Sequence, residues 1–134
     1  MAEEMMITFP GGLRVDAAYK GFTISTDQPV YAGGEGSAPA PFDLFLASIG
    51  ACAGFYVLAF CRERKIPPEK SHVVLRTEKN PETKRIGKII LDVHLPREFP
   101  EKYLRAVKKA VDGCSVKRHI MEAPQFELNT LLDT

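Results

Sequence analysis

The longest apolar stretch of the chain constrains its fold more than any other feature. Residues 44–61 read LFLASIGACAGFYVLAFC, which is 18 residues without a charge. That length is the lower edge of what crosses a bilayer as a helix, and Gly50 and Gly54 form a GxxxG pair of the kind that packs membrane helices together. The alternative is the central helix of a globular protein, buried on nearly all sides. We favour this alternative because the run is barely long enough and begins directly after Asp43.

The rest of the chain indicates one globular domain, residues 1–134. It has 45% hydrophobic and 26% charged residues, with 18 Lys and Arg against 17 Asp and Glu. This balance argues against disorder and against the one-signed surface that nucleic acid or anionic lipid would require, and it favours a small uncharged partner. Three cysteines are too few for a disulfide scaffold, and no secretory leader pattern is visible. We therefore expect a cytoplasmic protein with free thiols.

Alternation of apolar and polar residues predicts strands in the first third of the chain. Candidate strands cover residues 5–9, 13–18 and 22–24. Residues 27–41 are rich in Gly and Pro and predict an irregular loop. Pro41 suits the first turn of the following helix, and Asp43 in that turn complements its positive end. The helix is predicted to run to about Lys65.

The second half of the chain predicts a hairpin and two shorter helices. The strands cover residues 72–78 and 86–95, an amphipathic helix covers 100–112 with Gly113 as its cap, a short helical piece covers 115–121, and a final strand covers 126–130. In the second hairpin strand, Leu91 and Val93 share one face, while Asp92 and His94 share the other. Antiparallel strands around two helices, one of them buried, make an α+β fold.

Two of the three cysteines lie on the long helix and face away from each other. Cys52 and Cys61 are nine residues apart, about two and a half turns, so they cannot pair with one another. A cysteine in mid-helix gains nothing from that helix's N-terminus, so a reactive Cys52 would need a cation from another segment, for which Arg14 is the candidate. On the residues alone, a small core residue is the alternative interpretation of Cys52, and a solvated strand position that of Arg14.

The third cysteine, Cys114, follows the predicted cap Gly113. If a short helix starts there, Cys114 lies at its N-terminus near Lys117, Arg118 and His119, which would favour a thiolate. A buried cysteine in a turn is the alternative. The chain has no CxxC or HxxxH pairing and no phosphate-binding glycine motif, so we expect neither a metal nor a nucleotide cofactor.

Two segments around Cys52 and Cys114 match a known pattern. PAPFDLFLASIGACAGFYVLAF, at 39–60, holds a small-Pro-x-acidic-Leu helix start that leads to Ala-x-Cys or Gly-x-Cys, and VDGCSVKRHI, at 111–120, holds a later Cys-x-Val. Together with GGLRVDA, DQP and GG before them, they resemble the OsmC/Ohr family of osmotically induced and organic hydroperoxide resistance proteins. The resemblance covers nearly the whole chain and is closer to the YhfA-like branch than to the hydroperoxide reductases.

This resemblance implies an intertwined homodimer with the long helix buried and the active sites near the subunit interface. It also implies thiol peroxidase chemistry in oxidative-stress defence: the cysteine matching Cys52 attacks the O–O bond of an organic hydroperoxide, and the cysteine matching Cys114 resolves the sulfenic acid as a disulfide. A dithiol donor, either a lipoylated or a thioredoxin-like protein, would then reduce that disulfide. An arginine matching Arg14 would stabilise the thiolate and polarise the peroxide.

One position departs from the pattern of the reductases. Their bracing glutamate lies ten residues before the first cysteine, where this chain has Phe42. Asp43 is a candidate supporting residue, although nine helical positions from Cys52 it would project to the opposite side. The departure keeps a second function open, a dimeric protein that binds a small apolar ligand or senses oxidants without efficient turnover.

Overall fold

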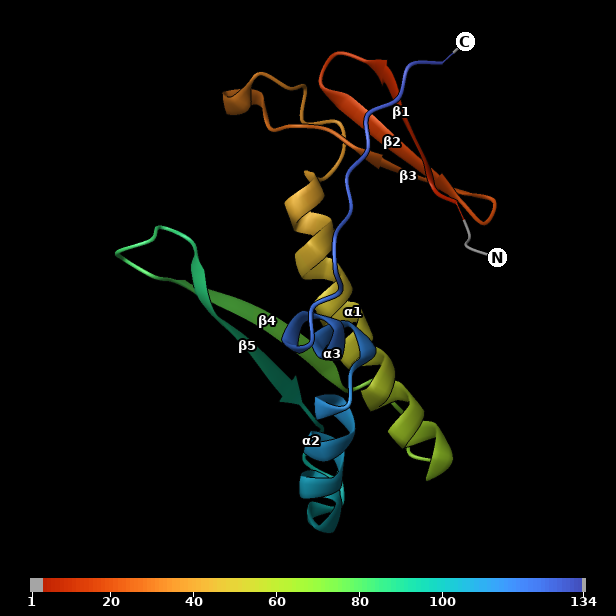
Figure 1. Cartoon of the computed structure of the whole chain (residues 1–134). Helices are drawn as coiled ribbons and strands as arrows, with labels where there is room; N and C mark the ends of the chain where they lie inside the picture. The colour runs from red at the N-terminus through yellow and green to blue at the C-terminus, as the bar shows by residue number, and fades with distance from the viewer. Residues whose placement is uncertain (1–3, 134) are drawn as a thin grey trace. The chain divides into compact units, whose positions relative to one another are not determined.

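The computed structural model describes residues 4–133 and has an α+β architecture (Figure 1). Its elements are β1 (Met6–Gly11), β2 (Arg14–Tyr19), β3 (Phe22–Thr26), the 3₁₀ turn η1 (Val30–Ala32), α1 (Pro41–Glu63), β4 (His72–Lys79), β5 (Ile86–His94), the 3₁₀ turn η2 (Glu101–Tyr103), α2 (Leu104–Asp112) and α3 (Ser115–Met121). The chain divides into two compact units after Ala47. We call residues 4–47 the first unit and residues 48–133 the second unit.

The first unit contains an antiparallel sheet in the order β1-β2-β3, which confirms the predicted meander. Lys20 and Gly21 both have positive φ, 50° and 82°, and connect β2 to β3 as a two-residue turn whose twist suits a hairpin. The register places Ile7 opposite Ala17, and Ala17 opposite Ile24. One face of the sheet is therefore apolar.

A hydrogen-bonded loop joins this sheet to α1. The buried Asp27 carboxylate accepts hydrogen bonds from the backbone N–H of Gln28 at 2.7 Å and from the Ser37 hydroxyl at 2.6 Å. The Asp27 N–H donates to the Pro39 carbonyl at 3.1 Å and closes the loop. A Cβ at position 34 would lie 2.0 Å from the Gln28 carbonyl oxygen, so only glycine fits there. The predicted irregular loop is thus a defined structure.

In the second unit, α1 ends two residues before the predicted Lys65. The Ile66 N–H donates to the Cys61 carbonyl at 2.8 Å, and the Lys65 N–H donates to the Arg62 carbonyl at 3.2 Å. Lys65 has a φ of 56°, so these bonds form a Schellman cap with lysine where glycine is usual. Ile66 packs against the core directly after this cap.

The core of the second unit lies where α1 packs against α2 and against the segment that precedes α2. Its buried members are Ala53, Val57, Phe60, Cys61, Phe99, Val107 and Val111. Leu91 and Val93 of β5 pack against this cluster, while His94 on the opposite face is exposed, as the alternation predicts. The β4–β5 hairpin and α3 are confirmed, and the helix predicted over 100–112 consists of the 3₁₀ turn η2 followed by α2, which begins at Leu104.

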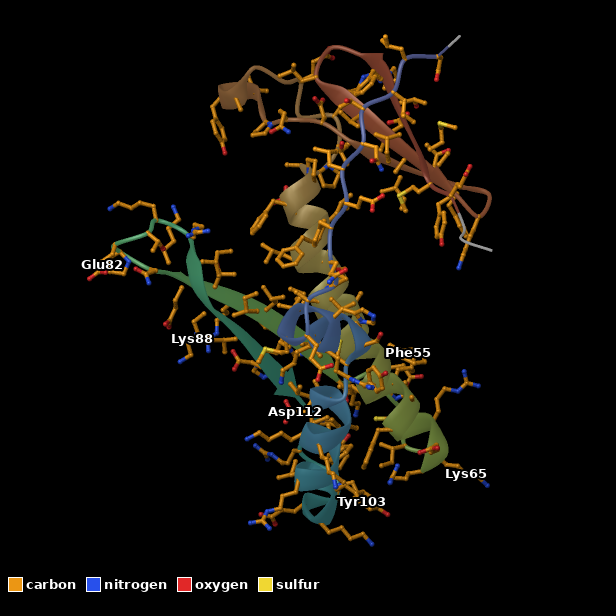
Figure 2. All side chains as sticks on the ribbon, in the orientation of Figure 1. Phe55, Lys65, Glu82, Lys88, Tyr103 and Asp112 are labelled. Atoms are coloured by element: carbon orange, nitrogen blue, oxygen red, sulfur yellow. The ribbon has the colours of Figure 1, made fainter. Side chains whose placement is uncertain are left out.

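The expectation that α1 is buried on nearly all sides is wrong for a single chain. Its buried residues form one stripe from Ile49 through Val57 to Cys61, and only 28% of its most apolar window is buried. Phe55 lies on the outer face and is 60% exposed (Figure 2). By length and composition alone, α1 also passes the test for a membrane-spanning helix. The apolar residues outside the stripe need another surface to cover them.

The predicted final strand over 126–130 is also wrong. Residues 122–133 have no strand or helix, and Phe126 and Leu128 are almost fully exposed. A strand exists only where a neighbouring strand accepts its hydrogen bonds, and this segment has no such pairing among the described residues. Alternation of side chains shows that a segment can be extended but does not supply the partner.

Candidate active site

The structure brings the Cys52 and Cys114 thiols together within the second unit. Cys52 lies in the middle of α1 and is partly exposed, while Cys114 is the buried residue that caps α3. The two thiols lie close enough for each to shift the pKa of the other. Cysteines 62 positions apart in the sequence therefore lie beside one another.

Local backbone structure holds Cys114 in place. The Cys114 N–H donates to the carbonyl of Val111 at 3.1 Å, so the residue continues the turn that ends α2. Its own carbonyl accepts the Arg118 N–H at 3.0 Å, which is the first hydrogen bond of α3. The predicted start of a short helix at this point is confirmed, and it fixes the direction of the Cys114 side chain.

The pKa of the Cys52 thiol is lowered from its ordinary value. Burial is the largest single influence and raises the pKa, but three hydrogen bonds to the sulfur outweigh it. The Cys114 thiol donates one, and the backbone N–H groups of Val116 and Ser115 donate the others. Each favours the thiolate because each places a positive hydrogen against the sulfur.

The pKa of the Cys114 thiol is raised instead. Burial is again the largest cause, and the hydrogen bond to Cys52 adds to it because Cys114 must keep its proton to donate. Backbone N–H groups of Lys117 and Val116 oppose the shift without reversing it. The two environments therefore shift the two pKa values apart, so that Cys52 is the first of the pair to lose its proton.

Sequence reasoning missed the source of this stabilisation. It looked for a cation to act on Cys52, whereas backbone N–H groups at the start of α3 reach the Cys52 sulfur from a distant part of the chain. The nearby Lys117 forms an ion pair with Asp112 at 2.9 Å, and His119 Nδ1 bonds the Ser115 carbonyl. The start of a helix directly after Cys114 is the sequence signal for these N–H groups, and in the sequence it points only to Cys114.

Arg14 and Asp43 both lie in the first unit. The Arg14 side chain is exposed, and its Nε donates to the Gly11 carbonyl at 3.4 Å. Asp43 accepts the Ala40 N–H at 3.1 Å, which is the reciprocal half of a helix capping box. Asp43 thus has a structural role at the start of α1, and a role of Arg14 at Cys52 stays a prediction.

Cys61 is a core residue. Its side chain has no exposed surface and belongs to the apolar cluster, and burial raises the pKa of its thiol. It lies away from Cys52, as the helical spacing predicts. A thiol in this position is held protonated and unreactive.

Two histidines of the β4–β5 hairpin also meet. His72 and His94 are opposite each other in the β4–β5 ladder, and their rings stack with centroids 4.6 Å apart. Over residues 4–133, however, His, Cys, Asp and Glu nowhere form a group of three that could hold a metal ion.

A cavity of about 450 Å³ lies beside Cys114 in the second unit. Its apolar lining includes Ile49, Ile86, Ile89, Leu91, Val111, Ile120 and Met121. Lys88, Lys117 and Asp112 supply its charged groups, and Figure 2 shows Lys88 on β5 and Asp112 at the end of α2. The second unit therefore contains both the thiol pair and a largely apolar cavity beside Cys114.

Residues 34–129 match the family model of the OsmC-like proteins. The chain belongs to the OsmC-like family. The match extends over well more than half of the chain and includes both Cys52 and Cys114. A comparison with curated proteins gave no match.

Solved structures share the fold of this OsmC-like protein. A Psychrobacter arcticus protein assigned to the osmotic stress and detoxification response has a TM-score of 0.72 at 22% identity, over 88% of this chain and 87% of that one. An OsmC-like protein from Mycoplasma pneumoniae has a TM-score of 0.69 at 13% identity, over 92% and 89%. An organic hydroperoxide resistance protein from Legionella pneumophila has a TM-score of 0.59 at 22% identity, over 90% and 89%. These identities are low, so the structures establish a shared fold.

Proposed function

We propose that this OsmC-like protein is a thiol-dependent peroxidase that reduces organic hydroperoxides through Cys52 and Cys114. The observation that carries the proposal is the proximity of the two thiols, at which the pKa of Cys52 is lowered and the pKa of Cys114 is raised. A peroxidatic cysteine needs a thiolate, and a resolving cysteine needs to be within bonding reach of it. Family membership supports the proposal because some relatives are named for hydroperoxide resistance.

The chemistry follows in two balanced steps. The Cys52 thiolate attacks the terminal oxygen of the hydroperoxide, an S–O bond forms, the O–O bond breaks, and the alkoxide leaves as an alcohol after taking up a proton. The Cys114 sulfur then attacks the Cys52 sulfenic acid. An S–S bond forms, the S–O bond breaks, and hydroxide leaves as water with the proton from Cys114.

We further infer the parts of the site that the second unit does not contain. Arg14 is proposed to polarise the peroxide, and a second copy of the chain is proposed to cover the exposed apolar residues of α1 in a homodimer. The proposed setting is the cytoplasm, where a dithiol protein reduces the disulfide. We also propose that the chain belongs to the YhfA-like branch, which its overall sequence pattern resembles more closely than it does the hydroperoxide reductases.

The test is a peroxide assay with the reduced protein and cumene hydroperoxide. We expect loss of hydroperoxide, loss of two thiols and a Cys52–Cys114 disulfide in the peptide map. Cys52→Ser should abolish the reaction, Cys114→Ser should stop it after one turnover with a sulfenic acid at Cys52, and the matched control Cys61→Ala should retain it. An unchanged thiol count without peroxide loss would refute the proposal.

A second function is kept because of one specific observation. Phe42 is 55% exposed and packs against Phe45 with ring centroids 5.3 Å apart, where the reductases carry their carboxylate. This aromatic pair favours a protein that binds a small apolar ligand or senses oxidants. Stoichiometric oxidation that dithiothreitol does not reverse would support this function, and repeated turnover would eliminate it.

A further inference from the structure

Two histidines that are 22 positions apart in the sequence lie side by side on the β4–β5 hairpin. His72 and His94 are cross-strand partners, and their rings stack with centroids 4.6 Å apart and an angle of 10° between the ring planes. We propose that these two rings together bind one divalent transition metal ion, such as Ni²⁺ or Cu²⁺. This site depends neither on the thiol pair nor on the proposed peroxidase activity.

The histidine pair, His72 and His94, faces away from the core. Val73 and Val93, the neighbours of the pair on the two strands, pack against the apolar cluster of the second unit. Because side chains alternate along a strand, both histidines are directed to the opposite face of the hairpin. Both side chains are exposed there. A metal ion therefore reaches the two rings from solvent without any opening of the core.

The ring nitrogens of the histidine pair are available as ligands. The third histidine, His119, has its Nδ1 bonded to the Ser115 carbonyl at 2.7 Å, whereas neither ring of the pair has a hydrogen bond within residues 4–133. Imidazole nitrogens lie about 2.0–2.1 Å from a bound zinc ion, so two of them at right angles on one ion of this size are about 3 Å apart. Directly opposed residues have Cβ atoms about 4.5–5.5 Å apart, and the exposed rings bind one ion by tilting toward each other.

The charges on this face of the hairpin do not repel a cation. The Asp92 carboxylate, two residues before His94, accepts a hydrogen bond from Arg76 Nε at 2.7 Å. Further along the ladder, Glu78 is the cross-strand partner of Lys88. Each of these two basic side chains therefore has an acidic neighbour on the same face, and no excess positive charge opposes the binding of an ion by the histidine pair.

The number of protein ligands selects the class of ion. Arg76 engages the Asp92 carboxylate, so the histidine pair supplies the two protein ligands and water completes the coordination. This count agrees with the finding that residues 4–133 contain no group of three metal-ligating side chains. Mg²⁺ and Ca²⁺ require oxygen ligands and do not fit a site of two nitrogens. Among the ions that accept imidazole, Cu²⁺ should bind more tightly than Ni²⁺, and Ni²⁺ more tightly than Co²⁺.

Equilibrium dialysis with Ni²⁺ measures the binding directly. Accessible thiols are first alkylated with iodoacetamide, so that Cys52 does not compete for the ion. We expect one Ni²⁺ to bind per chain. His72→Gln and His94→Gln should each abolish this binding because a single imidazole remains, whereas the matched control His119→Gln should retain it. Unchanged binding in both variants of the pair, or no binding by the chain without substitutions, overturns the proposal.

Metal binding should also stabilise the hairpin. His72 is the first residue of β4 and His94 is the last residue of β5, so an ion held by both connects the two strands at one end of their ladder. An ion that binds the folded chain alone raises its stability as the ion concentration exceeds the dissociation constant. The urea midpoint should therefore rise with Ni²⁺ and stay constant with Mg²⁺. The same rise with Ni²⁺ in His72→Gln would contradict the proposal.

Two further measurements test the ligands themselves. In the chain without substitutions, the ring protons of His72 and His94 should shift together in nuclear magnetic resonance spectra as Ni²⁺ is added, and those of His119 should not. This measurement does not depend on whether a variant folds. Asp92→Asn should retain the binding, because the carboxylate is not a ligand. A shift of only one ring of the pair, or loss of binding in Asp92→Asn, overturns the site of two imidazoles.

Discussion

Every buried apolar side chain among residues 4–133 lies in the second unit, from Ile49 on α1 to Cys114 before α3. In the first unit, the only buried residues are Thr26 and Asp27, and both are held by hydrogen bonds. The Thr26 hydroxyl donates to the Val15 carbonyl at 2.6 Å, and the Asp27 carboxylate gathers the loop that follows. One unit is thus stabilised by packing, and the other has well-defined local structure without an apolar core.

This difference indicates what the first unit lacks. A hydrogen bond contributes only about 0.5–1.5 kcal/mol net, and a sheet of three strands needs burial of an apolar face as well. Ile7, Phe22 and Ile24 are apolar residues of this sheet that remain exposed. The second copy that we propose as a partner would supply the missing cover.

The largest difference in stability between the two units is expected when one aromatic side chain is removed from each. Phe60 is 6% exposed and contacts Phe99 and Tyr103, so Phe60→Ala should lower the free energy of unfolding by about 3–5 kcal/mol. Phe9 is 80% exposed, so Phe9→Ala should change the stability of an isolated chain by less than about 0.5 kcal/mol. Urea unfolding measured at two protein concentrations, with sedimentation velocity, checks both.

The dependence of the unfolding free energy on protein concentration shows whether a second copy covers the first unit. If a second copy covers the first unit, Phe9→Ala weakens self-association, and its cost grows as the protein is concentrated. An equally large, concentration-independent cost for both variants would contradict the comparison, because the first unit would then have an apolar core within the single chain.

The next effect concerns the loop that Asp27 organises. Hydrogen bonds from the Ser37 side chain and backbone, and from the Gln28 backbone, lower the pKa of Asp27 from 3.8 to about 2. A carboxyl whose folded pKa is lowered contributes stability above its unfolded pKa and loses it as the pH falls through the folded value. The loop should therefore open between about pH 4 and pH 2, and cleavage by pepsin at residues 27–40 measures it.

A substitution distinguishes the titration of Asp27 from acid unfolding of the whole protein. Asp27→Asn removes the charge that these donors favour, so the loop should already be cleaved at pH 4, while Asp16→Asn on β2 should behave as the unmodified chain does. If Asp27→Asn retains full protection at pH 4, hydrogen bonding by the carboxylate does not hold the first unit's loop together.

Much of the fold and part of the site could be predicted from the sequence. The meander, the β4–β5 hairpin, the three helices and the opposed directions of Cys52 and Cys61 follow from side-chain periodicity, which is a local property. The end of α1 was misplaced because a left-handed lysine, Lys65, forms a cap that usually signals itself by glycine.

The rest depends on contacts between distant segments. Alternation at Phe126 and Leu128 predicts a strand, but the sequence of that segment does not show whether a neighbouring strand is available to pair with it. The donors to Cys52 are backbone groups of Ser115 and Val116, and a backbone N–H has no sequence signature. The pairing of Cys52 with Cys114 was implied by the family resemblance and could not be deduced from the spacing.

A smaller effect is expected for the pKa of Cys52, which we expect to depend on the second unit alone. Cys114→Ala removes the S–H donor, so the pKa of Cys52 should rise and the pH midpoint of its alkylation by iodoacetamide should move upward. Arg14→Ala, in the first unit, should move the midpoint less, because the hydrogen bonds that lower the Cys52 pKa all come from the second unit. A larger shift for Arg14→Ala would show that the first unit completes the thiolate site.

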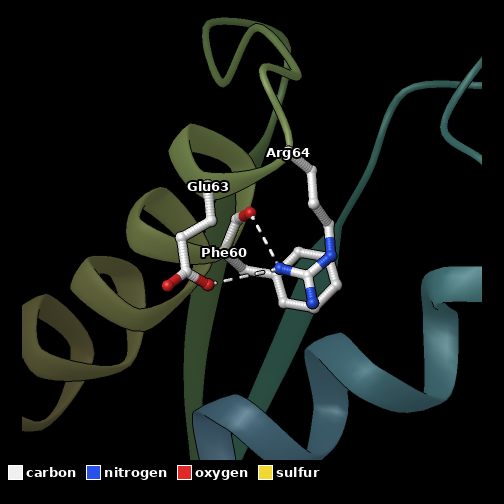
Figure 3. A network of polar contacts seen from close by, with 3 residues as sticks. All are labelled: Phe60, Glu63 and Arg64. Carbon is white, nitrogen blue, oxygen red and sulfur yellow. Dashed lines mark hydrogen bonds and ion pairs between the residues drawn. The ribbon is translucent and has the colours of Figure 1, made fainter.

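The smallest effect on stability is expected where Arg64 packs against the aromatic rings of Phe60 and Tyr103 in the core of the second unit. The Arg64 guanidinium lies 3.6 Å from the centre of the Phe60 ring and donates to the Phe60 carbonyl at 3.3 Å (Figure 3). It also lies 5.3 Å from the centre of the Tyr103 ring. Its ion pair with Glu63, at 3.5 Å, is exposed and adds little. Arg64→Ala should therefore cost about 0.5–1 kcal/mol from the loss of the cation–π contact.

The control for this edge is Arg62→Ala, which removes an exposed arginine from the last turn of the same helix. Arg64→Lys keeps the positive charge but not the flat guanidinium that stacks on Phe60, so it should recover only part of the loss. Urea midpoints of the three variants rank the contributions. Equal midpoints for Arg64→Ala and Arg62→Ala would mean that stacking on Phe60 contributes nothing, and that burial of apolar side chains alone separates the second unit from the first.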